Sequence, residues 1–178
     1  RAMSTLLSLG HGYSARALAR RLVPQGWRVI GTTRNPAKAD QFRDEGVEPL
    51  MWPGDLAWVL EEATHILCSA APDAKGDPFL QAVPEIASSK AGWVGSLSTT
   101  GVYGDRQGGW VDEDSALRAV NARSRWRIAA EADWLARGLN VEIFRLSGIY
   151  GPGRSALDRL REGRAQRIVK AGQVFSRI

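Results

Sequence analysis

Short apolar runs alternate with amphipathic stretches along the chain, and this alternation predicts strands that alternate with helices. Most of the runs are apolar throughout, which is typical of strands buried on both faces of a parallel sheet. The predicted strands cover 5–9, 27–33, 47–52, 64–70, 92–98 and 140–147. The predicted helices cover 13–23, 36–44, 56–62, 78–90, 121–137 and 155–162, and residues 105–120 form a loop.

This order of elements predicts an α/β fold of the Rossmann type, a doubly wound parallel sheet with helices on both faces. We expect residues 1–150 to form this dinucleotide-binding domain. Residues 151–178 contain a Gly-Pro-Gly turn and one short helix. We expect them to be the start of a truncated C-terminal substrate-binding region, most of which is absent.

A glycine turn joins the first predicted strand to the first helix. Gly10, Gly12 and Ala15 give the spacing G-x-G-x-x-A, in the strand–turn–helix context that a dinucleotide site requires. Gly10 would permit the tight turn, Gly12 the approach of a pyrophosphate, and Ala15 close packing of the helix on the sheet. His11 and Tyr13 are further cofactor candidates; His11 faces either the pyrophosphate or solvent. The alternative is a plain turn with incidental glycines.

The end of the second predicted strand favours NADP over NAD. An NAD site places an acid about 20 residues after the glycine turn, whereas this strand ends in Thr33 and Arg34, with Lys38 one helical turn later. A guanidinium suits a 2′-phosphate. The alternative is that both basic residues are only solvated surface. Asp55 either approaches the adenine or caps a helix, and Ser69, after the fourth strand, is a further cofactor candidate.

Composition narrows the function classes. The formal net charge is +5, but the basic residues are dispersed, so a phosphate-bearing small ligand explains them and no nucleic acid is expected. No apolar run approaches the ~20 residues that span a membrane. The sequence has 1 cysteine, Cys68, in an apolar run, which predicts a buried thiol, no metal site and a cytoplasmic location.

The segment STTGVYGD at residues 98–105 follows the fifth predicted strand, at the sheet edge where such folds bind ligands. Together with GHGYSA, IAAE in the long helix and RLSGIYGPGR after the last strand, it resembles the extended and atypical short-chain dehydrogenases/reductases, the NAD-dependent epimerase/dehydratase family. The resemblance spans essentially the whole chain. Leu9 stands where the family has the first glycine of its turn, which points to the atypical branch.

The resemblance implies that Thr99 binds the substrate oxygen. In the family, a Tyr and a Lys four residues apart at the start of the long helix supply the acid/base chemistry. Aligned on residues 129–131, Arg123 takes the Tyr position and Arg127 the Lys position. A guanidinium stays protonated at any working pH and cannot exchange that proton. Arg127 can still bind a ribose hydroxyl, and we expect Arg123 to contact substrate.

Three further residues complete the predicted site. Tyr103 is the nearest phenol and is either a substitute acid or part of the structural turn that the family has there. Thr100 is a substrate-binding candidate, and Tyr150 shapes the wall on the substrate side.

Two functions remain open at this point. The first is an NADP-binding oxidoreductase of the epimerase/dehydratase type, acting on a small carbonyl or sugar-nucleotide substrate, with NAD as the alternative cofactor. The second is a non-catalytic sensor or regulatory protein that binds the same cofactor.

The resemblance also implies a homodimer that pairs through the long helix. Trp126, Ala130 and Trp134 form the candidate face; the tryptophans pack against the sheet in the other interpretation.

Overall fold

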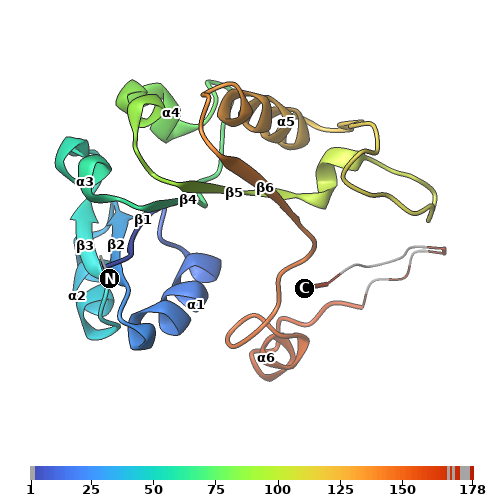
Figure 1. The fold of residues 1–178 in the computed structure, drawn as a ribbon. Helices are drawn as coiled ribbons and strands as arrows, with labels where there is room; N and C mark the ends of the chain where they lie inside the picture. The colour runs from blue at the N-terminus through green and yellow to red at the C-terminus, as the bar shows by residue number, and fades with distance from the viewer. Residues whose placement is uncertain (1–2, 168, 170, 173–176) are drawn as a thin grey trace.

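Six parallel strands form one sheet in the order β3-β2-β1-β4-β5-β6 (Figure 1). The computed structural model describes residues 3–167, 169, 171–172 and 177–178. The strands are β1 (Thr5–Leu9), β2 (Arg28–Thr33), β3 (Glu48–Met51), β4 (His65–Cys68), β5 (Trp93–Thr99) and β6 (Val141–Leu146). The predicted doubly wound Rossmann fold is confirmed.

The helices cover both faces of the sheet. Figure 1 shows α1 and α2 on one face and α3, α4 and α5 on the other. The α-helices are α1 (Tyr13–Leu22), α2 (Pro36–Asp44), α3 (Ala57–Glu62), α4 (Pro78–Ala82), α5 (Ala122–Leu135) and α6 (Ala156–Arg161). Short 3-10 helices are η1 (Val23–Gln25), η2 (Pro84–Ser88) and η3 (Thr100–Tyr103).

Alternate residues of β1 supply two separate cores, because successive side chains of a strand point to opposite faces. Leu6 packs with Ala15 of α1 and Phe42 of α2. Leu7 and Leu9 belong to the core that α3, α4 and α5 cover. A sheet buried in this way explains why the central strands are apolar throughout.

The connections that follow β1 and β4 run to opposite sides of the sheet, so the strand order reverses between these two strands. From β1 it runs through α1 to β2 on one side, and from β4 it runs through α4 to β5 on the other. β1 and β4 are hydrogen-bonded neighbours, paired from Leu6 with His65 to Leu9 with Cys68. Ligands of open α/β sheets bind at the carboxyl end of this switch point.

The helix predicted over 78–90 is wrong in its length. Asp77 starts α4 by accepting hydrogen bonds from the N–H groups of Phe79 (2.9 Å) and Leu80 (3.2 Å). The α-helix ends at Ala82, and η2 begins at Pro84. A proline has no N–H and disfavours helical backbone at the residue before it, so the helix cannot continue through Pro84.

The predicted dimer face on α5 is wrong in two of its three residues, since Ala130, at 6% exposed, and Trp134 are both buried within the single chain. Trp134 is completely buried within the single chain, and its Nε1 donates to Asp77 Oδ2 at 3.1 Å. Trp134 therefore packs against the sheet, as the alternative interpretation had it. A homodimer remains a prediction, but its interface cannot contain Ala130 or Trp134.

Residues 151–178 lie beyond β6 and contain α6. In Figure 1, α6 lies on the same side of the sheet as α1. Positions 168, 170 and 173–176 of the predicted C-terminal region, with residues 1–2, lie outside the described residues. The domain division at residue 150 stays a prediction.

Candidate functional site

The glycine turn between β1 and α1 is tight and leaves the start of the helix without a side-chain cap. Gly10 has a φ of 76°, and a Cβ there would lie 3.0 Å from the backbone nitrogen of Ala70, so only glycine fits. Gly12 is the N-cap of α1 and provides no side-chain cap, and the first turn of α1 has no acidic residue. The first N–H groups of the helix and its positive dipole end are thus left for an anion.

Neighbouring strands fix the shape of this turn. The Gly10 N–H donates to Thr32 Oγ1 at 2.7 Å, and the Ser69 hydroxyl donates to the carbonyl oxygen of Gly10 at 2.9 Å. Ala15, on the side of α1 that packs on the sheet, is fully buried, as its predicted packing role requires. Ser69, which directly follows β4, and Thr32 of β2 therefore hold the turn in place through these two hydrogen bonds.

His11 is buried rather than solvent-facing, which rules out one of its two predicted orientations. Its side chain is 5% exposed, and its Nδ1 lies 2.8 Å from Ser8 Oγ. Its ring meets that of Phe42 edge-on with centroids 4.7 Å apart. Burial lowers the pKa of His11 to about 4, so the imidazole is neutral at physiological pH. A Cβ on Gly31 would lie 2.7 Å from this ring, which explains the glycine in β2.

Basic side chains stand at the end of β2. Arg34 and Lys38 are both exposed, and within the described part of the chain neither forms an ion pair. Thr33 Oγ1 accepts a hydrogen bond from the Asn35 N–H at 3.1 Å. Asp55 Oδ1 accepts one from the N–H of Ala57, the first residue of α3, at 2.8 Å, but the N-cap position itself is held by Leu56.

The hydroxyl residues at the end of β5 and in η3 differ in their surroundings. Thr99 Oγ1 accepts a hydrogen bond from the Gly101 N–H at 3.1 Å and caps η3, where Thr100 is the first residue. Tyr103 is buried, and its hydroxyl oxygen accepts from Arg145 Nη1 at 3.0 Å. The Arg145 guanidinium also lies 5.1 Å from the centroid of the Tyr103 ring. These contacts favour the structural role for Tyr103 over that of an acid.

The two arginines at the family's acid/base positions lie in different environments. Arg123 is exposed on the first turn of α5. Arg127 is half-buried, and its Nη1 donates to the carbonyl oxygens of Leu97 (2.8 Å) and Ala70 (3.3 Å). Burial lowers the pKa of Arg127 from its ordinary value, with opposing contributions from Cys68, Asp77 and Glu131. Arg127 thus spans the carboxyl ends of β4 and β5, a position from which it can bind a ligand hydroxyl but not shuttle a proton.

Two buried acids were not predicted as parts of the site. Glu131 accepts hydrogen bonds from the Ser98 hydroxyl and from Arg145, whose Nη2 lies 2.9 Å from its Oε2. Asp77 accepts from Trp134 and from Cys68 Sγ at 3.2 Å. The sequence does contain a signal for Glu131: its carboxylate stands in the otherwise apolar segment IAAE.

Tyr13 connects the glycine turn to the C-terminal segment. Its hydroxyl donates to the carbonyl oxygen of Pro152 at 3.0 Å, and the Arg154 guanidinium lies 4.2 Å from its ring centroid. A Cβ on Gly151 would lie 2.4 Å from the Tyr13 hydroxyl. Tyr150, which precedes Gly151 in the sequence, is 60% exposed. The predicted substrate side and the predicted cofactor side are therefore in direct contact.

Among the described residues, no group of three or more His, Cys, Asp or Glu side chains is placed to hold a metal ion. No helix in the described part of the chain is long and apolar enough to cross a membrane.

Comparison with known proteins identifies homologous chains. Protein YeeZ of Escherichia coli K12 is 31% identical, over 85% of this chain and 61% of that protein. A conserved protein of unknown function from Silicibacter pomeroyi DSS is 52% identical, with a TM-score of 0.91 over 99% of this chain and 63% of that one. The chain thus spans about three fifths of the relatives that it matches. No protein-family model matches it.

More distant solved structures share the fold. UDP-glucuronic acid 4-epimerase from Bacillus cereus, solved in complex with NAD, has a TM-score of 0.69 at 19% identity, over 90% of this chain and 61% of that one. At this identity the match concerns the fold alone. The resemblance expected from the sequence motifs is confirmed: the chain is homologous to YeeZ and, over most of its length, has the fold of the NAD-dependent epimerase/dehydratase family, the extended short-chain dehydrogenases/reductases.

Proposed function

We propose that the chain is the dinucleotide-binding part of an NADP-dependent oxidoreductase or epimerase that acts on a small carbonyl or sugar-nucleotide substrate. The observation that carries this proposal is the turn at Gly10, where a side chain would collide with Ala70 and where α1 presents an uncapped N-terminus. Gly12 and the first N–H groups of α1 would hold the diphosphate, and Arg127 would bind a ribose hydroxyl. A bound nicotinamide would supply hydride transfer. Homodimer formation and a cytoplasmic location remain part of the proposal.

The preference for NADP rests on Arg34. Its exposed guanidinium follows β2 directly, at the place where an NAD site has an acid. A charge-assisted hydrogen bond to the 2′-phosphate contributes about 1.5–3 kcal/mol. Arg34→Ala should therefore weaken NADPH binding by about tenfold or more and leave NADH binding nearly unchanged, as measured by calorimetry. Arg21→Ala is the matched control, since Arg21 is an exposed arginine in the last turn of α1.

Equal losses for both nucleotides in Arg34→Ala would refute the NADP assignment. Absence of binding for both nucleotides to the wild-type protein would refute the proposed function as a whole.

A non-catalytic sensor of the same cofactor is the second candidate, and the surroundings of Arg123 and Arg127 favour it. Neither guanidinium can exchange a proton. The hydroxyl oxygen of Tyr103 accepts a hydrogen bond from Arg145, which favours a structural role for this phenol. An assay of the full-length protein against a panel of carbonyl substrates separates the two candidates. Turnover that falls on Thr99→Ala supports the enzyme; tight NADPH binding without turnover supports the sensor.

A further inference from the structure

Arg127 places a fixed positive charge on one side of the glycine turn. Its Nη1 donates to the carbonyl oxygen of Ala70, which follows β4, and to that of Leu97 in β5. Ala70 is also the residue against which Gly10 packs, since a Cβ on Gly10 would lie 3.0 Å from its backbone nitrogen. The guanidinium therefore lies beside the turn at the carboxyl ends of β4 and β5. Arg34 lies on the other side of the turn, after β2.

No carboxylate among the described residues forms an ion pair with Arg127. The acceptors of its hydrogen bonds are neutral carbonyl oxygens. Asp77 and Glu131 are near enough to favour the charged guanidinium, but both carboxylates have other donors. Glu131 is paired with Arg145. Asp77 accepts hydrogen bonds from the Trp134 indole and from N–H groups at the start of α4. The charge of Arg127 is thus only partly offset.

The start of α5 adds to this positive potential. Its first turn contains no acid, and the positive end of the helix dipole lies there. The loops after β4 and β5 contain Asp73 and Asp105, which are exposed and accept hydrogen bonds from backbone N–H groups of their own turns. Water screens exposed charges far more than it screens a half-buried guanidinium. The arginines of this half of α5 are Arg123, Arg125 and Arg127.

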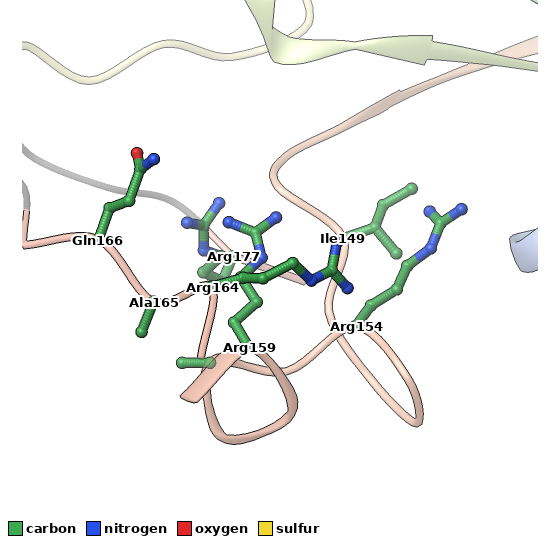
Figure 2. Close-up of a pocket in the computed structure, with 8 residues that line it drawn as sticks. Ile149, Arg154, Arg159, Arg164, Ala165, Gln166 and Arg177 are labelled. Atoms are coloured by element: carbon green, nitrogen blue, oxygen red, sulfur yellow. The ribbon is translucent and has the colours of Figure 1, made fainter. Parts of the chain in front are cut away.

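A second group of arginines lies beyond β6. Figure 2 shows Arg154, Arg159, Arg164 and Arg177 around α6, with Arg154 apart from the other three. Arg154 lies over the ring of Tyr13, the first residue of α1, and so belongs to the side where the diphosphate is proposed to bind. The diphosphate has the same charge in the oxidised and the reduced cofactor. This second group therefore acts on both forms alike.

We propose that Arg127 makes the site selective for the reduced cofactor, so that NADPH binds more tightly than NADP⁺; this inference rests on the proposed function. A dinucleotide crosses the sheet at the switch point, with one nucleotide half on each side. With the 2′-phosphate at Arg34 and the diphosphate at Gly12, the nicotinamide half belongs at the ends of β4 and β5, beside Arg127.

The two forms of the cofactor differ in charge at that half. The oxidised nicotinamide ring carries a positive charge, and the reduced ring is neutral. A guanidinium cannot lose its proton at any working pH, so Arg127 repels the oxidised ring and leaves the reduced ring unaffected. When both forms are present at equal concentration, the reduced form occupies most of the sites. Occupancy of the protein then follows the redox state of the cofactor pool.

Calorimetric titration with NADP⁺ and with NADPH in the same buffer tests the inference through the ratio of the two dissociation constants. The wild type should bind NADPH about tenfold more tightly than NADP⁺, and Arg127→Gln should reduce this preference to about twofold or less. Losing the hydrogen bonds to Ala70 and Leu97 weakens the binding of both forms alike, so this loss cancels in the ratio. Arg127→Lys keeps the charge and should keep the preference.

Arg125→Gln is the matched control, because Arg125 is exposed on the same helix and its replacement removes the same charge. Its preference should stay within about twofold of the wild-type value, since solvent screens an exposed charge. Equal affinities of the wild type for both forms, or an unchanged preference in Arg127→Gln, overturn the inference and leave the proposed function standing. Equal reductions in Arg127→Gln and Arg125→Gln overturn it too. Absence of binding for both nucleotides refutes the proposed function and the inference with it.

Discussion

His11 lies inside a turn proposed to bind phosphates, yet its own chemistry belongs to the core. The ring contacts Ser8, Phe42 and the space left by Gly31, and its Nε2 has no hydrogen-bond partner among the described residues. Protonation would place an unpaired charge in this buried position, which explains why the pKa of His11 falls to about 4.

Acid should therefore destabilise the protein through His11. In the unfolded chain His11 takes up a proton near its ordinary pKa of about 6.5, whereas in the folded chain it does so only near 4. The contribution to the free energy of unfolding is complete above pH 6.5 and falls as the pH decreases toward 4, by about 2 kcal/mol at about pH 5. Urea unfolding of wild type and His11→Gln at about pH 7.5 and about pH 5 checks this. The wild type should lose about 2 kcal/mol more than the variant; parallel losses would contradict the assignment.

The sequence identifies residues whose role depends on near neighbours along the chain. Gly10, Gly12 and Ala15 could be found from spacing, because the turn and the start of its helix are local. The burial of His11 could not, since it depends on Phe42 of α2 and Gly31 of β2, which only the folded sheet brings beside the turn.

At the scale of elements, one buried ion pair joins α5 to the edge of the sheet. Glu131 of α5 is 4% exposed and accepts hydrogen bonds from Arg145 of β6 and Ser98 of β5. The hydrogen bond to Glu131 raises the pKa of Arg145 above its ordinary value, followed by a smaller contribution from Tyr103. The pair thus fixes α5, β6 and η3 together at the end of the sheet where the site lies.

Breaking this pair should cost more than removing an exposed carboxylate. Glu131→Gln leaves the Arg145 guanidinium without its partner, and we expect a loss of about 3 kcal/mol in the free energy of unfolding. Glu142→Gln is the control, because Glu142 is exposed on β6 and should change stability by less than about 0.5 kcal/mol. Chemical denaturation of the two variants gives the comparison. Similar small losses in both would show that the pair adds nothing to stability.

Elements were predictable where local pattern and packing agree. The apolar runs gave all six strands and their parallel arrangement, because strands covered on both faces must be apolar throughout. The helix predicted over 78–90 ends before Pro84 in the structure, because a proline interrupts helical hydrogen bonding whatever the hydrophobic periodicity. The partner of Trp134 could not be predicted either, because Asp77 is 57 residues away in the sequence.

At the scale of the whole molecule, Tyr13 joins the first helix to the segment after the last strand. Its hydrogen bond to Pro152 spans 139 residues of sequence, and Arg154 covers its ring. The C-terminal segment is therefore held against the glycine turn through one side chain of α1.

Removing the Tyr13 hydroxyl should loosen only that segment. A hydrogen bond of this kind contributes about 1 kcal/mol, so Tyr13→Phe should speed amide hydrogen exchange around α6 by about fivefold and leave the central strands unchanged. Tyr150→Phe is the control, since Tyr150 is largely exposed. Faster exchange throughout the sheet in Tyr13→Phe would contradict a local role for this contact.

The position of Cys68 gives the protein a built-in reporter of its own opening. Its thiol is 1% exposed at the centre of the sheet and donates to Asp77, and burial together with that carboxylate raises its pKa. The sulfur lies in the core between the sheet and the helices α3, α4 and α5, so a thiol reagent can reach it only when that covering layer opens. Because the sequence holds 1 cysteine, each molecule is labelled once, and the labelling rate under native conditions measures how often this core opens.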